Sequence, residues 1–426
     1  MARPILAVIF GTFTLRLATG ITGSMLVYYF ADFPAHGGEA VTALEVGIMG
    51  ALFYASELIG SPIFGVLSDR IGHRRVMLIG PAFGAVAVII TAFTVSLPVI
   101  GFTRLLEGAS TAASVPSILG FIAFATAGNE LLRGKAVARF EAATLAGLLS
   151  GFVVGGFLFQ ALGPMAFLAN ALVYVVSFLI YRYGVPEHAE PEPSGRAHDP
   201  EEGLRRYLRI LRGSHVWLLA PTWIAINATL GLFTSQTLFQ LVREPAPQFA
   251  DQALMGGFEP WQMSVGLAIG GLLFFAGLFY WGGKFKDMRR TTIILYGIAG
   301  GAVMLVAALG INHFGADVMA LLLVLVAIAA GGLFVLAGAT PAAIGLLADV
   351  SEKFPGDRGA IMGLYSVFLG VGQIGGALLG GVLAEFRGMD GLLVGTAAVL
   401  GLALIPLAQL RKVEHYLGPG EPATIG

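Results

Sequence analysis

The 426-residue chain contains no cysteine and few charged residues. The missing cysteine excludes disulfide bonds and any catalytic or metal site built on thiolates, but it leaves the cellular compartment open. Asp, Glu, Lys and Arg make up 12% of the residues, about half the share of an ordinary globular protein. The net charge of −1 gives no reason to expect nucleic-acid binding. With 56% hydrophobic residues and a mean hydropathy of +0.82, the chain has the composition of a membrane protein.

A helix that crosses a bilayer needs about 20 mostly apolar residues, so the stretches without charge predict the membrane spans. No Asp, Glu, Lys or Arg occurs between Glu141 and Arg182, a stretch long enough for two helices around a turn at residues 160–164. The whole chain predicts twelve spans, at residues 5–30, 45–67, 76–97, 99–126, 135–159, 164–182, 215–241, 261–281, 291–311, 317–348, 359–384 and 391–410. We therefore expect an all-α integral membrane protein.

The orientation of the spans follows from the basic residues, because cytoplasmic loops retain Lys and Arg. Of the 25 Lys and Arg, twenty fall in the chain ends and even-numbered connections, and only Arg243 and Arg387 fall in odd-numbered ones. This bias predicts a multi-pass protein of the cell's inner (plasma) membrane with both termini in the cytoplasm. The N-terminus lacks a small-residue cleavage site, so residues 5–30 are expected to remain as the first helix.

One long polar segment, residues 185–213, divides the spans into two sets of six. It begins rich in Pro and Glu and ends in LRRYLRILRG, in which Leu and Arg are spaced as in a short amphipathic helix on the inner membrane surface. We expect an N-terminal six-helix bundle at residues 1–184, this linker, a C-terminal six-helix bundle at 214–412 and a cytoplasmic tail at 413–426.

The two halves of the chain resemble each other. Shifting the second half by 225 positions produces the pairs Pro116–Pro341, Gly120–Gly345, Gly134–Gly359, Gly147–Gly372, Gly151–Gly376, Gly155–Gly380 and Gly156–Gly381 without a gap. Six glycines coincide in a 45-residue window where chance predicts one or two. The sequence therefore predicts a duplication, with two copies of six spans in the same orientation, an arrangement found in one large class of transporters.

A charged, glycine-framed turn follows the second span. Its pattern, Gly65-x-x-x-Asp69-Arg70-x-Gly72-x-Arg74-Arg75, closely resembles the loop signature of the major facilitator superfamily, and a degraded copy, Gly283-x-x-x-Asp287, follows the eighth span. The resemblance implies the fold of that superfamily, with twelve transmembrane helices in two pseudo-symmetric six-helix bundles. It also implies a latch in which Gly65 and Asp69 meet the start of the eleventh helix near Arg358 and stabilise the outward-facing state. The alternative is a plain positive-inside anchor.

Two further motifs extend the resemblance. Arg104-Leu-Leu-Glu-Gly108 is similar to the superfamily's Arg-x-x-x-Gly motif, which is associated with proton coupling. The glycine series from Gly147 to Gly156 resembles the motif of the drug:proton antiporter branch, but that branch has proline where Phe152 stands. The alternative for the glycines is ordinary small-residue helix packing, which the second half repeats at Gly372, Gly376, Gly380 and Gly381. Pro116 and Pro341 fall mid-span and are expected to bend their helices, either as an aid to rocking or as inherited geometry.

Charged residues inside the membrane are functional candidates by default. The first half contains four, Arg16, Glu57, Arg104 and Glu107, and the second half contains none near mid-membrane. Glu57 is twelve residues from both Glu45 and Asp69, at a depth where its charged form is costly, so it is our preferred proton carrier. The alternative is a permanent pair with Arg16 or Arg104. Arg104 and Glu107 lie three residues apart on one helical face, and they either take part in proton coupling or neutralise each other.

Small and polar stripes indicate where a substrate binds. The family resemblance implies a central cavity lined by the first, fourth, seventh and tenth helices. On the first span Arg16 shares a face with Thr12 and Thr19, and on the seventh Trp223, Asn227 and Thr234 form a comparable stripe. The alternative is helix packing with satisfied polar groups. A lining of this kind favours an amphipathic or largely apolar organic molecule over a sugar.

No enzyme signature is present in the sequence. There is no Walker-type glycine–lysine loop, which argues against ATP-driven transport, and the seven histidines show no metal-ligand spacing. We therefore expect a monomeric secondary active transporter without cofactor or metal, working by alternating access in the lipid bilayer. Its expected activity is efflux of small amphipathic organic or drug-like molecules, with protons as the coupling ion. One alternative is uptake or facilitated transport of a small organic anion, which unpaired Arg16 and Arg104 in the cavity would favour. The other is a transport-inactive membrane receptor or assembly partner.

Overall fold

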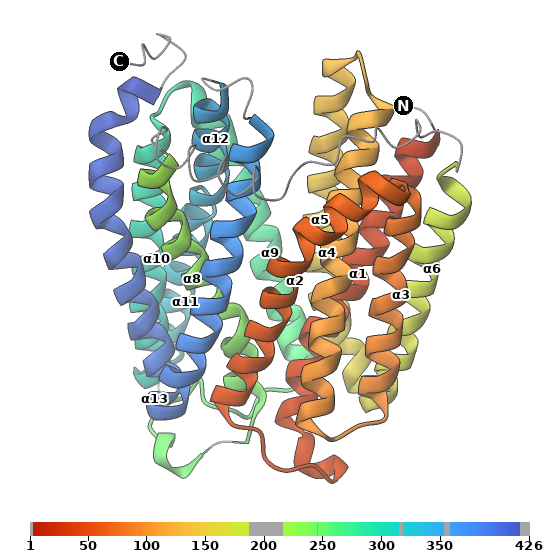
Figure 1. Cartoon of the computed structure of the whole chain (residues 1–426). Helices are drawn as coiled ribbons and strands as arrows, with labels where there is room; N and C mark the ends of the chain where they lie inside the picture. The colour runs from red at the N-terminus through yellow and green to blue at the C-terminus, as the bar shows by residue number, and fades with distance from the viewer. Residues whose placement is uncertain (1–2, 187–215, 245, 315–317, 353–357, 418–426) are drawn as a thin grey trace. The chain divides into compact units, whose positions relative to one another are not determined.

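The computed structural model describes residues 3–186, 216–244, 246–314, 318–352 and 358–417, and every regular element in these residues is a helix (Figure 1). The chain divides into two compact units. Unit 1 contains α1 (Arg3–Ala31), α2 (Ala43–Ile71), α3 (His73–Ala92), α4 (Leu97–Ala125), α5 (Glu130–Leu162) and α6 (Ala166–Gly184). Unit 2 contains α8 (Val216–Val242) as far as Gln240, α10 (Arg290–Phe314), α11 (Met319–Leu336), α12 (Ala339–Glu352) and α13 (Arg358–Leu417). α9 (Pro260–Gly283) is divided between the units at Ala268.

Each predicted span coincides with helical residues, with differences at a few ends. α3 ends at Ala92 instead of residue 97, because a charge-free run conceals the turn that precedes Leu97 and Pro98 in the first turn of α4. α13 covers the last two spans and is interrupted at Gly388, whose φ of 58° and ψ of −137° suit only glycine. The expected amphipathic helix in the linker lies outside the described residues.

The tenth span is interrupted just before Pro341, near the position where the sequence predicts a bend. The tenth span consists of two helices, α11 and α12, which are separated at Ala337 and Gly338. Pro341 is the third residue of α12, and the interruption includes Ala337, the residue four positions earlier whose carbonyl a proline cannot use as a hydrogen-bond acceptor. Its repeat partner Pro116 lies inside the continuous helix α4.

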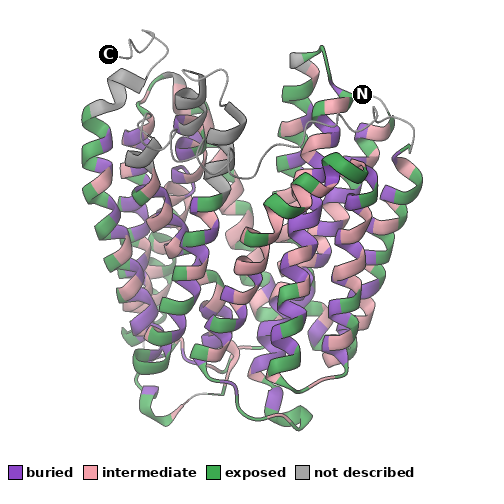
Figure 2. Ribbon diagram, in the orientation of Figure 1, coloured by how far each residue is buried: buried purple, intermediate pink, exposed green. Residues whose placement is uncertain are grey.

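Large apolar side chains are exposed along many helices, among them Leu172, Leu272, Phe279, Val306 and Leu323. Exposed residues run the length of the outer helical faces in Figure 2. An exposed apolar area of this extent is unfavourable in water and suits contact with lipid chains.

The same helix contact occurs in both units. In unit 1, a Cβ atom at Gly147 of α5 would lie 2.5 Å from the carbonyl oxygen of Phe13 and 3.0 Å from the Cβ of Arg16 on α1. In unit 2, a Cβ at Gly372 of α13 would lie 2.6 Å from the carbonyl oxygen of Ile224 and 2.7 Å from the Cβ of Asn227 on α8. Phe13 and Arg16 therefore correspond to Ile224 and Asn227 with one common shift. The equivalent contacts support the duplication, because glycine at these positions lets two helix backbones touch in the same register.

At the predicted outer end of unit 2, a hydrogen-bonded cluster joins three segments. The Nδ2 of Asn312, near the end of α10, donates to the carboxylate of Asp390 at 2.8 Å, and the Asn312 Oδ1 accepts from the backbone N–H of Leu254 at 2.9 Å. His313 lies 2.9 Å from the same carboxylate, and the backbone N–H of Asp390 donates to Gln252 at 3.2 Å. These bonds attach the connection before α9 to α10 and to the turn at Gly388.

Candidate functional site

Arg16 lies where α1, α4 and α5 meet. Its side chain is half-buried, and its Nη1 donates a long hydrogen bond of 3.5 Å to the Oγ1 of Thr111 on α4. Because Gly147 has no side chain, α5 passes directly beside the base of this arginine. A cation is therefore held in the middle of α1, between three helices of a membrane-spanning unit.

Two carboxylates, the half-buried Glu57 and the exposed Glu141, lie close enough to this cation to interact with its charge, and neither pairs with it directly. The charge of Arg16 interacts electrostatically with Glu57 on α2 and with Glu141 on α5. Among the described residues, neither carboxylate has an ion pair within 4.0 Å or a side-chain hydrogen bond. Gly108 of α4 packs against the α2 backbone at Phe53 and Glu57, which brings Glu57 close to the helix that carries Thr111. The three ionisable groups form one electrostatic cluster, which we call the Arg16 cluster.

Glu141 is a member of this cluster that sequence reasoning missed. In the sequence, Glu141 marks the end of an apolar interval, which suggests a position at the end of a span. In the structure α5 begins at Glu130, about three helical turns earlier, so Glu141 lies within the helix. The available signal was its separation of six residues from Gly147, which places it within two turns of the contact with α1.

Arg104 and Glu107 form a separate buried ion pair within α4, between the Arg104 Nη1 and the Glu107 Oε2. The Arg104 guanidinium also lies over the ring of Phe53 on α2, 4.7 Å from its centroid. The second carboxylate oxygen of Glu107 has no hydrogen-bond partner among the described residues. In this arrangement Arg104 compensates Glu107 and forms no ion pair with Glu57.

The threonines predicted to line the cavity bond within their own helix. The hydroxyls of Thr12 and Thr19 donate to the carbonyls four residues earlier, Val8 and Leu15, at 2.8 and 3.0 Å. Thr12 is buried and Thr19 is half-buried. The hydroxyl of Thr12 is therefore hydrogen-bonded and its side chain is buried, as expected of a structural residue in this conformation.

In unit 2, Trp223 and Asn227 are buried and Thr234 is exposed. The Asn227 Nδ2 donates to the carbonyl of Trp223 at 2.8 Å, and the Thr234 hydroxyl donates to the carbonyl of Leu230 at 2.8 Å. Asn227 occupies the position that corresponds to Arg16, so unit 2 has a neutral amide where unit 1 has a cation.

The turn from Gly65 to Arg75 connects α2 and α3. Gly72 has a φ of 98°, which favours glycine, and Arg74 is buried, with its Nη2 donating to the carbonyl of Arg182 at the end of α6. Asp69, Arg70 and Arg75 are exposed.

Packing inside unit 1 does not explain Gly65. A Cβ atom there would meet only the Cβ of Pro116, at an ordinary distance of 3.6 Å. The predicted partner of the turn, Arg358, begins α13, and its side chain lies outside the described residues. The latch, which would join unit 1 to unit 2, stays a prediction.

In the described part of the chain, no three His, Asp or Glu side chains lie close enough together to hold a metal ion. The Arg16 cluster consists of one guanidinium and two carboxylates, groups that recognise charge and bind protons.

Two helical units with a matching helix contact, rich in exposed apolar residues and with charged residues among the helices of one of them, have the features of a membrane transporter. The model of the Major Facilitator Superfamily matches residues 8–337. The chain therefore belongs to this superfamily, and the predicted fold class is confirmed.

Several known proteins are similar to the chain. It is 23% identical over 394 residues to the quinolone resistance protein NorA of Staphylococcus aureus strain MSSA476, which covers 90% of this chain and 91% of that protein. It is 28% identical over 353 residues to multidrug resistance protein 1 of Bacillus subtilis strain 168, covering 81% and 82%. The crystal structure of a mutant of the nucleoside transporter NupG superimposes with a TM-score of 0.70 over 96% of this chain and 99% of that chain. At 12% identity, this last likeness shows the fold alone.

Proposed function

We propose that the chain exports small amphipathic organic or drug-like molecules in exchange for protons, as a monomer with both termini in the cytoplasm. The observation that carries the proposal is Glu57, a carboxylate inside a membrane-spanning helix that has no direct partner among the described residues and interacts with the charge of Arg16. The names of the two resistance proteins support export and the class of substrate.

The charges of the Arg16 cluster give a reason for exchange. With both carboxylates ionised, one cation faces two anions, and the cluster has one negative charge in excess. That charge attracts the positive group of an organic cation, and more strongly than in water because Arg16 and Glu57 are partly buried. A proton on Glu57 removes the excess charge and weakens the attraction. Proton and organic cation therefore compete for one charge, which is the thermodynamic requirement of antiport.

A second candidate function is uptake of a small organic anion. It is favoured because Arg16 has no ion pair within 4.0 Å among the residues that the structure describes, so that its guanidinium would bind a carboxylate of the substrate. In that case Arg16 is essential and Glu57 is not.

The test uses proteoliposomes that contain the purified chain and a pH-sensitive dye. Ethidium, tetraphenylphosphonium and benzoate are added one at a time, and both proton flux and movement of the compound are recorded. We expect a cation-triggered proton flux that disappears in Glu57→Gln and persists in Glu259→Gln, the control at an exposed carboxylate. Cation movement without proton flux in the unmodified chain would refute coupling. Benzoate movement that is lost in Arg16→Ala but kept in Glu57→Gln would establish the second candidate.

A further inference from the structure

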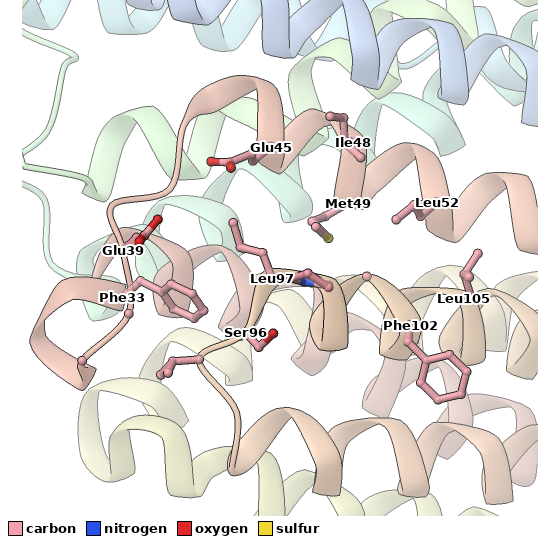
Figure 3. A pocket seen from close by; sticks show the side chains of 15 residues that line it. Phe33, Glu39, Glu45, Ile48, Met49, Leu52, Ser96, Leu97, Phe102 and Leu105 are labelled. Atoms are coloured by element: carbon pink, nitrogen blue, oxygen red, sulfur yellow. The ribbon is translucent and has the colours of Figure 1, made fainter.

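A groove opens at the predicted outer end of unit 1, between α2 and α4 (Figure 3). Its volume is about 810 Å³, within the range of pockets that bind drug-sized molecules. The α1–α2 connection and the α3–α4 connection close one end of it. All of its lining residues belong to unit 1.

Each helix contributes one face to the groove. From α2 come Glu45, Ile48, Met49 and Leu52, and from α4 come Pro98, Gly101, Phe102 and Leu105, both with the spacing i, i+3, i+4, i+7 of a single helical face. Gly101 keeps the space between the helices open, because a Cβ there would lie 3.3 Å from the Cδ1 of Leu52. Along the helices the walls are apolar.

The charge of the groove has one sign. Among the described residues, its only charged lining residues are Glu39 and Glu45, and no Lys or Arg lines it. The basic residue next to the lining residue Leu105 is Arg104, which is paired with Glu107. Glu45 accepts a hydrogen bond from the backbone N–H of Thr42 in a capping box. Glu39 is exposed and forms no hydrogen bond or ion pair with a described residue. Figure 3 shows both carboxylates at one end of the groove and Phe102 and Leu105 at the other.

We propose that this groove is a second ligand site, which binds monovalent lipophilic organic cations with the positive group beside Glu39 and Glu45 and the apolar body along Ile48, Leu52 and Phe102. A positive group is attracted by two carboxylates that no basic lining residue neutralises. An organic anion is repelled by the same charges, and a lipid chain has no group that uses them. The site differs from the Arg16 cluster, which contains a guanidinium.

The test is equilibrium binding, so it does not depend on coupling, direction or transport. Tetraphenylphosphonium and tetraphenylborate have similar shape and opposite charge, and their binding is measured on the full chain in nanodiscs of phosphatidylcholine without a pH gradient. We expect the cation to bind more tightly than the anion after correction for partition into protein-free nanodiscs. In the double variant Glu39→Gln/Glu45→Gln, cation affinity should fall by about fivefold, the ratio typical of exposed charge pairs. The anion should not bind more weakly in that variant.

The variants are chosen to keep the fold. Glutamine at residue 45 retains the capping box, and Glu39 has no bond to lose. Phe102→Ala changes an exposed side chain and should lower the binding affinity of both ions. Glu259→Gln lies outside the groove and should change neither affinity. A tetraphenylphosphonium analogue with an azide group should label residues 48–52 or 101–105 after illumination. Equal cation affinity in the unmodified chain and the double variant, or labelling confined to other residues, would overturn the proposal.

Discussion

A single methyl group added at Gly151 is expected to lower the melting temperature of the chain by several degrees. Gly151 is on α5, in the contact with α1, and a Cβ atom there would lie 2.8 Å from the Cα of Gly20 and closer still to the carbonyl oxygen of Leu17. All of these neighbours are backbone atoms, which no side-chain rotation can move aside. The two helices must therefore separate or tilt to admit the methyl group.

The size of the effect follows from this geometry. Overpacking a tight contact costs about 1–3 kcal/mol. Since 1 kcal/mol lowers the melting temperature of a unit of 150–250 residues by about 2–4 °C, Gly151→Ala should lower it by roughly 2–12 °C. The repeat predicts a loss of similar size for Gly376→Ala, where a Cβ would lie 2.9 Å from the Cα of Ala228.

Tryptophan fluorescence during heating in detergent is the appropriate assay, because the chain has four Trp and no cysteine for thiol-reactive dyes. The matched control is Gly266→Ala in α9, where a Cβ would meet no atom within 4 Å. Alanine is the better helix former, so this control should be neutral or slightly stabilising. Equal melting temperatures for Gly151→Ala and Gly266→Ala would refute the role assigned to the glycine contact.

Three further predictions concern other parts of the chain. Glu107→Gln leaves the buried Arg104 without its ion-pair partner and should lower the free energy of unfolding by about 3–5 kcal/mol, whereas the double variant Arg104→Met/Glu107→Met should recover most of this loss. If Glu107→Gln melts at the same temperature as the unmodified chain in the same assay, the prediction is contradicted. Asn312→Ala removes the hydrogen bonds to Asp390 and to the Leu254 backbone, so it should lower the free energy of unfolding by about 1–3 kcal/mol and speed amide hydrogen exchange in residues 252–256. Unchanged exchange would show that the cluster does not hold this connection in place. A membrane-impermeant maleimide applied to intact cells should label Glu39→Cys but not Asp69→Cys, and the reverse result would invert the topology.

The membrane spans and the repeat were predictable from the sequence, because span length and the spacing of glycines are properties of the chain itself. The packing of Gly147 against Arg16 and of Gly372 against Asn227 gives a physical reason for the coincidence of glycines in the two halves. The relation between Arg16 and Asn227 was not predictable, because the first and seventh spans share no obvious sequence pattern.

Other features depend on contacts between distant residues, which one sequence does not reveal. Pro341 predicted a disturbance of the tenth span, but the exact place of the break also involves Gly338, whose Cβ would lie 2.6 Å from the ring of Trp281, a residue of another helix. The position of Glu141 beside Arg16 needs the packing of α5 on α1. The charge motif after the second span predicted a turn, but the anchoring of Arg74 on the carbonyl of Arg182 joins residues that are more than one hundred positions apart.

The contact of α5 with α1 through glycine also limits the motions available during a transport cycle. Two helices whose backbones touch at successive turns cannot slide past each other without collision, because the atoms in contact belong to the rigid helical frame. α1 and α5 therefore travel as one body and carry Arg16 and Glu141 at a nearly constant separation. Within this pair the geometry is nearly the same at every stage of the cycle, so a change of shape at the Arg16 cluster has to come from α2, which carries Glu57.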